Sequence, residues 1–183
     1  MTDPEHDEPE EIVWQGKFIT AKTRGRWEYV GRARGIRAAV ILAVDEDDHV
    51  LLVQQYRVPL GRDCLELPAG LIGDDDGGAD EDPLAAAGRE LEEETGYRAA
   101  NLKDCGTYYS SPGMVSESFT LVRASGLTKV SEGGGVEGEN ITVHRIPRSD
   151  LPRFIAAKRA EGCGIDVRLL MLLGEALVRG ESE

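Results

Sequence analysis

The sequence predicts a single α/β domain built around a mixed β-sheet. Apolar runs of strand length dominate the first half of the chain, and two segments with helical periodicity interrupt and close the sheet. The chain has 183 residues, of which 40% are apolar and 30% charged. Such a composition can bury enough apolar surface to fold as one domain.

The expected strands follow one another along the chain. The runs at 38–44 (AAVILAV) and 50–56 (VLLVQQY) flank the polar turn DEDDH, so they predict a β-hairpin. Shorter apolar stretches predict further strands at 64–67, 118–122 (SFTLV) and 141–146 (ITVHRI).

Two helices are expected beside these strands. The first covers 83–95, with Asp82 as N-cap, Pro83 at the first helical position and Gly96 after the last turn. The second starts near Ile165 and runs through a series of leucines towards Val178, as a packing face that carries no chemical group.

Glu90, Glu93 and Glu94 share one face of the first helix, because their spacing is i, i+3 and i+4. Three carboxylates within one turn repel one another, and a divalent cation reverses the sign of that interaction. Oxygen ligands without His or Cys beside them favour Mg²⁺ or Mn²⁺ over zinc. Arg89 lies one turn before Glu93 and is expected to orient that carboxylate by a fork-type hydrogen bond.

Charge is distributed unevenly along the chain, whose formal charge is −13. Acids gather at 1–11, 74–82 and 89–94, whereas residues 17–37 carry seven basic side chains. We expect this where metal cations and an anionic substrate meet, and a solvated charged surface is the alternative. The overall acidity argues against nucleic-acid binding, which requires a basic surface.

Cys64, Cys105 and Cys163 are far apart and predict neither a disulfide framework nor a zinc site. The acidic N-terminus lacks the features of a signal peptide, and no apolar run approaches the ~18 residues that span a bilayer. We therefore expect a cytoplasmic protein that does not enter a membrane.

The segment 89–97 (RELEEETGY) resembles the second half of the Nudix box, whose pattern is G x5 E x7 R E U x E E x G U with U apolar or aromatic. Glu81 fills the upstream Glu position, and ELPAGLI at 66–72 resembles the strand and turn before the box, with Gly70 as its first glycine. Ten residues separate Gly70 from Glu81 where the pattern has five, so the loop that enters the helix is five residues longer.

The resemblance extends from residue 12 to residue 178 and favours the Nudix enzymes that act on ADP-ribose and related ADP-sugars. It implies an α/β/α sandwich around a mixed sheet, with a small N-terminal β segment. It also implies Mg²⁺-dependent hydrolysis of a nucleoside diphosphate sugar to AMP and a sugar phosphate. The alternatives are another nucleoside diphosphate derivative, such as a GDP-sugar or a dinucleotide, and a nucleotide-binding Nudix domain without catalysis. Inert domains usually lose a metal carboxylate, and this chain keeps all three.

The resemblance also implies roles for residues near the box. The carbonyl of Ala69 is expected to join Glu90, Glu93 and Glu94 at the metal. Arg32 and Arg57 are expected to bind the phosphates. For these two arginines, surface solubility or an ion pair with Glu28 is the alternative.

Residues of the N-terminal segment are expected to bind the nucleoside. Trp27 is expected to stack on adenine, with Phe18 as a second platform, or else to fill space beneath this segment. The resemblance implies four further substrate-binding positions: Glu28, Gly70, Leu71 and Gly113.

A general base is expected on the Gly-rich segment 131–140, where the resemblance implies a catalytic Glu on a mobile loop. The candidates are Glu139, which directly precedes Asn140 and the next strand, and Glu137; we favour Glu139. The glycines at 133–135 and 138 are expected to give the backbone freedom for this loop to close over substrate.

These expectations divide the chain into three parts. Residues 1–11 are a disordered acidic tail, 12–37 a segment for substrate binding and dimerisation, and 38–183 the Nudix hydrolase domain. Because the N-terminal segment packs across a two-fold axis in the enzymes that this chain resembles, a homodimer is expected.

Overall fold

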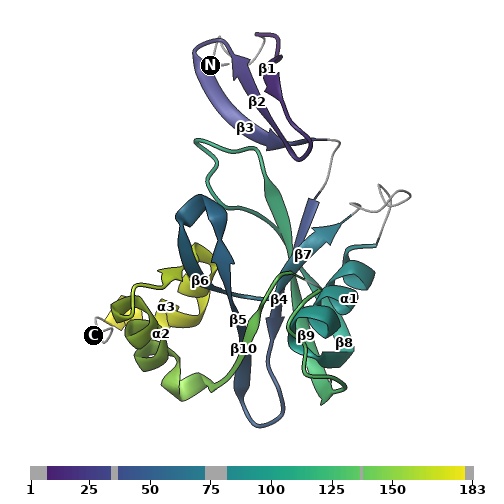
Figure 1. Ribbon diagram of the computed structural model, residues 1–183, viewed down its shortest axis with the longest axis vertical. Coiled ribbons are helices and arrows are strands. Elements are labelled where there is room, and N and C mark those ends of the chain that lie inside the picture. Colours follow the sequence, from purple (N-terminus) through teal and green to yellow (C-terminus); the bar gives the residue numbers. More distant parts are fainter. Residues whose placement is uncertain (1–7, 34–36, 73–81, 137, 180–183) are drawn as a thin grey trace.

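A computed structural model describes residues 8–33, 37–72, 82–136 and 138–179 (Figure 1). Residues 1–7 of the expected tail lie outside the described residues, and residue 11 begins the first strand. Three strands then form a separate antiparallel sheet: β1 (Glu11–Gln15), β2 (Ile19–Arg24) and β3 (Trp27–Arg32). In Figure 1 this sheet projects from the rest of the molecule.

The body contains two four-stranded sheets. The first has the order β7-β4-β9-β8, and its strands are β4 (Arg37–Ala43), β7 (Ala69–Ile72), β8 (Tyr97–Tyr109) and β9 (Ser118–Lys129). The second has the order β10-β5-β6-β11, and its strands are β5 (His49–Arg57), β6 (Arg62–Glu66), β10 (Thr142–Pro147) and β11 (Gly164–Ile165). Strands β4 and β9 pair in parallel, as do β6 and β11, so both sheets are mixed.

The helices cover the outer faces of the two sheets, with α1 (Pro83–Thr95) on one side and α2 (Leu151–Ala160) and α3 (Leu170–Arg179) on the other (Figure 1). Alternation along β4 explains the layers. Ala39 and Ile41 face a core that includes Leu91 of α1, whereas Val40 faces a core that includes Ile155 of α2. The result is the predicted α/β/α sandwich.

The predicted hairpin between residues 38–44 and 50–56 is wrong. Val44 and Val50 form one isolated bridge at the turn, after which β4 and β5 enter different sheets. Each strand is buried through its centre, so each needs partners on both edges and a helix or sheet on both faces.

The C-terminal helix starts later than predicted, at Leu170. Gly164 and Ile165 instead pair with β6, and the Asp166 carboxylate then accepts from Arg168 N–H at 2.8 Å to cap a short 3₁₀ turn. Helix α2 and strand β8 were not predicted. Leu151 and Ile155 are the buried residues of α2, and β8 is an edge strand with mostly exposed side chains, so neither gives a strong apolar period.

Candidate active site

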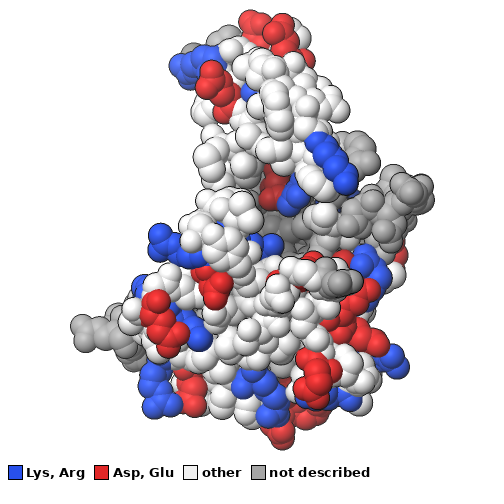
Figure 2. Space-filling view, viewed as in Figure 1, with Lys and Arg blue, Asp and Glu red and all other residues white. Residues whose placement is uncertain are grey.

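A pocket of about 610 Å³ opens between the two sheets of the body, beside the N-terminal sheet. Its walls come from β5, β6, β7 and α1, and from the loops before β9, β10 and α3. In Figure 2 the surface is hollowed between the N-terminal sheet and the body. The pocket brings together eight predicted site residues: Arg32, Arg57, Ala69, Gly70, Leu71, Glu90, Glu94 and Glu139.

Helix α1 supplies the acidic wall of this pocket. Its start is fixed by Asp82, whose side chain accepts from the N–H of Leu84 at 3.2 Å, and Leu91 is fully buried against the sheet. When the Leu91 face of the helix packs on the sheet, Glu90 and Glu94, which are one turn apart, line the pocket.

Glu94 is a buried carboxyl, with 5% of its surface exposed. Burial raises its pKa to about 8, and the nearby carboxylates of Glu90 and Glu139 act in the same direction. The N–H of Ala69, which donates to Glu94 Oε2 at 3.0 Å, and the charge of Arg57 oppose the shift. Without a cation the acidic wall is therefore electrostatically strained.

Strand β7 lies directly against this wall. A Cβ atom added at Gly70 would collide with the side-chain carboxyl of Glu90, so the first glycine of the box leaves room for a metal-ligand candidate. Leu71 follows it along the pocket, and the Ala69 backbone contacts Glu94 as described. The close approach of β7 to α1 explains why a glycine stands at position 70.

Arg89 and Glu93 lie outside the pocket lining. Arg89 Nη1 is 2.7 Å from Glu90 Oε1 and 3.6 Å from Glu93 Oε2, so its shorter contact is with Glu90 rather than with the expected Glu93. Glu93 lines a neighbouring hollow together with Arg89, Glu92 and the loop glycines Gly133 and Gly135. The predicted trio of carboxylates is thus divided, with two in the pocket and one beside it.

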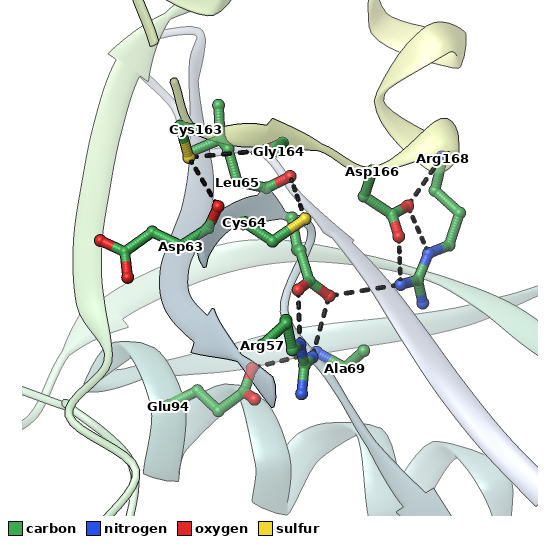
Figure 3. Close-up of polar contacts among 11 residues, drawn as sticks. Arg57, Asp63, Cys64, Leu65, Ala69, Glu94, Cys163, Gly164, Asp166 and Arg168 are labelled. Carbon is green, nitrogen blue, oxygen red and sulfur yellow. Dashed lines mark hydrogen bonds and ion pairs between the residues drawn. The ribbon is translucent and has the colours of Figure 1, made fainter. Parts of the chain in front are cut away.

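Other residues that line the pocket form a charge network (Figure 3). Arg57 donates from Nε and Nη2 to the two oxygens of Glu66, at 2.6 and 2.9 Å. Arg168 donates to Glu66 at 3.4 Å and makes shorter bonds to Asp166, at 2.6 and 2.7 Å. The hydrogens on Nη1 of Arg57 are directed away from Glu66, which suits a second acceptor.

Glu66, Asp166 and Arg168 were not predicted as site residues. A signal was present for Glu66, because it is a carboxylate between Leu65 and Leu67 at the buried end of β6, and it is 3% exposed. Asp166 and Arg168 follow β11, and the sequence shows no reason for that segment to return to the pocket.

Arg32 is paired with Glu117 rather than with Glu28, the partner considered from the sequence. Its Nε lies 2.6 Å from Glu117 Oε1, and both residues line the pocket. Backbone hydrogen bonds at Val30 dock β3 on the same loop, from Val30 N–H to the Met114 carbonyl (3.0 Å) and from Ser116 N–H to the Val30 carbonyl (2.9 Å). Arg32 thus reaches the pocket from the N-terminal sheet.

Other predicted substrate-binding residues lie apart from this pocket. Trp27 and Gly113 line a second hollow of about 290 Å³, with Tyr29 and Val115. Trp27 is 48% exposed and does not fill a core beneath the N-terminal segment. Phe18 is 50% exposed, Glu28 is exposed as well, and neither lines the hollows described above. Glu137 and Glu81 lie outside the described residues.

The donors present in the pocket fit a hard divalent cation. Glu90, Glu94 and Glu139 offer carboxylate oxygens, and among the described residues no His lines this pocket. A second group, Asp45, Asp47 and His49, also has ligand atoms close together. Its carboxylates are already occupied, because Asp45 and Asp47 both accept hydrogen bonds from Arg145, at 2.6 and 2.8 Å.

Comparison with known proteins agrees with this geometry. The model of the NUDIX domain family matches residues 34–161, and the chain belongs to this family. The match confirms the resemblance predicted from the box residues. Enzymes of this family generally use divalent metals.

Two relatives of this chain are named as pyrophosphatases. The ADP-ribose pyrophosphatase of Bacillus subtilis (strain 168) is 34% identical over 122 residues, which are 66% of this chain and 63% of that protein. The GDP-mannose pyrophosphatase of Cronobacter sakazakii is 35% identical over 156 residues, 80% of this chain and 76% of that protein. The chain thus spans less than two thirds of the length of the Bacillus protein.

A solved structure confirms the fold. The crystal structure of an ADP compounds hydrolase superposes with a TM-score of 0.66 and 27% identity, covering 94% of this chain and 93% of that one. Among the residues described, there is no helix with the length and apolar character needed to cross a membrane.

Proposed function

We propose that this protein hydrolyses the pyrophosphate of a nucleoside diphosphate sugar, with ADP-ribose as the first candidate, to a nucleoside monophosphate and a sugar phosphate. One observation carries the proposal: a strained carboxylate wall and an arginine held by Glu66 line the same pocket. A pyrophosphate between two organic groups carries two negative charges, so it requires both a cation site and hydrogen-bond donors.

We assign separate roles in this reaction to the residues of the pocket. Glu90 and Glu94 hold a divalent cation, Mg²⁺ in our proposal with Mn²⁺ as substitute, together with Glu93 and the Ala69 carbonyl. A cation bound there supplies charge neutralisation and lowers the pKa of water. Glu139 accepts the proton of the attacking water, with Glu137 as the alternative base. Arg57, held by Glu66, binds phosphate oxygens, and Arg32 does so from the N-terminal sheet.

The name of the Bacillus relative supports ADP-ribose, and the second hollow supports an adenine stacked on Trp27. Phe18, Glu28 and Gly113 complete the nucleoside side in this proposal, and Gly70 and Leu71 border the phosphates. The second candidate is a GDP-sugar, which the name of the Cronobacter relative favours.

We also propose a homodimer formed by the N-terminal segment. Apolar side chains of β1 and the turn after it are exposed: Ile12 (55%), Val13 (61%), Trp14 (57%) and Phe18 (50%). Covering them with a second copy would remove this apolar surface from water and bring aromatic side chains to the partner's pocket. A cytoplasmic location is part of the same proposal.

The deciding experiment is a substrate panel with Mg²⁺ in ¹⁸O-labelled water, including ADP-ribose, GDP-mannose, a dinucleoside diphosphate and ATP. Products are identified by mass, and the phosphate that carries ¹⁸O reveals which phosphorus is attacked. We expect turnover of a nucleoside diphosphate sugar and loss of turnover in Glu94→Gln. Tight nucleotide binding without turnover of any compound would contradict the proposal and support a binding domain.

A further inference from the structure

The Gly-rich loop before β10 is bonded to the carboxyl end of α1. Gly134 N–H donates to the carbonyl of Glu94 at 2.9 Å, and Gly135 N–H donates to the carbonyl of Glu93 at 3.0 Å. The last carbonyls of a helix have no partner within the helix, so a loop from 40 residues further along the chain provides their donors.

Two glycines meet where the loop crosses the helix end. Gly133 and Gly96 have φ angles of +67° and +76°. A Cβ atom on Gly133 would lie 2.6 Å from Gly96 N and 2.7 Å from the carbonyl oxygen of Glu94, and one on Gly96 would lie 2.7 Å from Gly133 N. The neighbouring atoms belong to the backbone and cannot rotate away. The contact therefore requires a glycine both at the end of α1 (Gly96) and in the loop (Gly133).

The same crossing leads directly to Glu139. The carbonyl of Gly134 accepts from Ile141 N–H at 3.1 Å, so the chain leaves Gly134 and returns to it. Within this excursion the Glu139 carboxylate accepts from Val136 N–H at 2.9 Å, and Glu139 N–H donates to the Val136 carbonyl at 3.1 Å. A Cβ atom on Gly135 would collide with the same carboxylate.

We propose that Gly133 is a positioning residue: by packing without a side chain on the end of α1, it fixes Glu139 relative to Glu90 and Glu94. The inference rests on the proposed function, because it assigns Glu139 the role of base. It also revises the expected role of Gly133, which in this proposal serves close packing against α1 rather than freedom to move.

The first test uses the wild-type protein and requires no activity. Hydrogen exchange followed by NMR is expected to show protected amides at Gly134 and Gly135, because both donate to carbonyls of α1. Exchange of these two amides at the rate of an exposed loop amide, with or without Mg²⁺, would overturn the proposal.

The second test compares two Gly→Ala variants with the same backbone strain. Gly126 has the same φ of +67° as Gly133, and its Cβ would lie 2.8 Å from Ala100 Cβ, on a part of β9 that does not line the pocket. With Mg²⁺ and the substrate found in the panel, Gly133→Ala is expected to lower kcat about 10–100-fold with KM within about threefold. Gly126→Ala is expected to lose stability and keep kcat.

A double variant separates positioning from a general loss of structure. Glu139→Gln added to Gly133→Ala is expected to cause little further loss of kcat, because a displaced base has little left to contribute. Fully multiplicative losses would overturn the proposal. If Gly133→Ala does not fold, Ser131→Ala replaces it, since Ser131 Oγ accepts from Gly133 N–H at 3.2 Å. A several-fold loss of kcat with faster exchange at Gly134 is then expected, and unchanged values would overturn the proposal.

The outcomes separate this inference from the proposed function. If Glu139→Gln lowers kcat strongly and Gly133→Ala does not, the positioning role is wrong and the base stands. If Glu139→Gln retains wild-type kcat, the assignment of the base is wrong, and the positioning role fails with it.

Discussion

Replacing Glu94 by Gln is expected to stabilise the metal-free protein at pH 8. The carboxyl is 5% exposed, and its pKa is raised from 4.5 to about 8, mainly by burial. Gln has nearly the same shape, and its amide oxygen still accepts the hydrogen bond from Ala69 N–H. The substitution therefore removes the buried charge and keeps the contact.

The pH dependence follows from the direction of this shift. Below pH 4.5 the carboxyl is neutral in both the folded and the unfolded chain, and it contributes no difference. As the pH rises from 4.5 towards 8, the unfolded chain ionises and the folded chain does not, so the free energy of unfolding falls. At pH 8 the loss reaches about 4 kcal/mol, which corresponds to roughly 8–16 °C in Tm for a chain of this size.

Thermal and urea denaturation in EDTA between pH 5 and pH 8 test this expectation. The difference between Glu94→Gln and wild type should be small at pH 5 and grow to several degrees at pH 8. Glu92→Gln is the matched control on the same helix, because Glu92 is paired with Arg98 at 2.8 Å and its pKa is lowered by that hydrogen bond. A Glu94→Gln variant that is less stable than wild type at pH 8 would refute the reasoning.

Four further predictions concern metal, catalysis, substrate binding and assembly. Mg²⁺ should raise the Tm of wild type at pH 8 more than that of Glu94→Gln, and equal gains would contradict the metal assignment. Glu139→Gln should lower kcat about 10²–10⁴-fold with little change in KM; if Glu137→Gln shows the larger loss instead, the base is Glu137. Arg57→Lys should raise KM about tenfold, because Lys cannot reproduce the two bonds to Glu66, and an unchanged KM would exclude a phosphate contact. Removing residues 1–33 should abolish dimerisation in light scattering and weaken substrate binding, whereas a fully active full-length monomer at micromolar concentration would contradict the dimer.

Local sequence signals were sufficient to predict α1, because residues at both of its ends mark where it begins and stops. The N-cap at Asp82 and the left-handed Gly96 set the bounds of α1 as predicted, Pro83–Thr95. Local signals failed for the strands, because their pairing depends on which other strands compete for their edges. Whether 38–44 and 50–56 pair with each other depends on β7, β9, β6 and β10, which compete for their edges, and the turn sequence between them contains no information about these competitors.

The site shows the same division. The carboxylates on α1 were predictable because their spacing is fixed by the helix, and so was the neighbourhood of Ala69 and Gly70 through the box pattern. Asp166 and Arg168 reach the pocket because β11 pairs in parallel with β6, a contact across 100 residues. The pairing of Arg32 with Glu117 likewise depends on how β3 docks on the loop before β9.

The charges of the pocket explain why its arginines alone do not make it attractive to an anion. Arg57 and Arg168 are offset by Glu66 and Asp166, and Arg32 is offset by Glu117. Of the acids on the α1 wall, Glu90 is paired with Arg89 at 2.7 Å, and Glu94 ionises only at high pH because burial raises its pKa to about 8. On the proposed function, the arginines therefore orient the substrate, and the affinity for it depends on the cation held by the wall. On that function, the cation would offset the same buried charge of Glu94 that destabilises the metal-free protein at high pH.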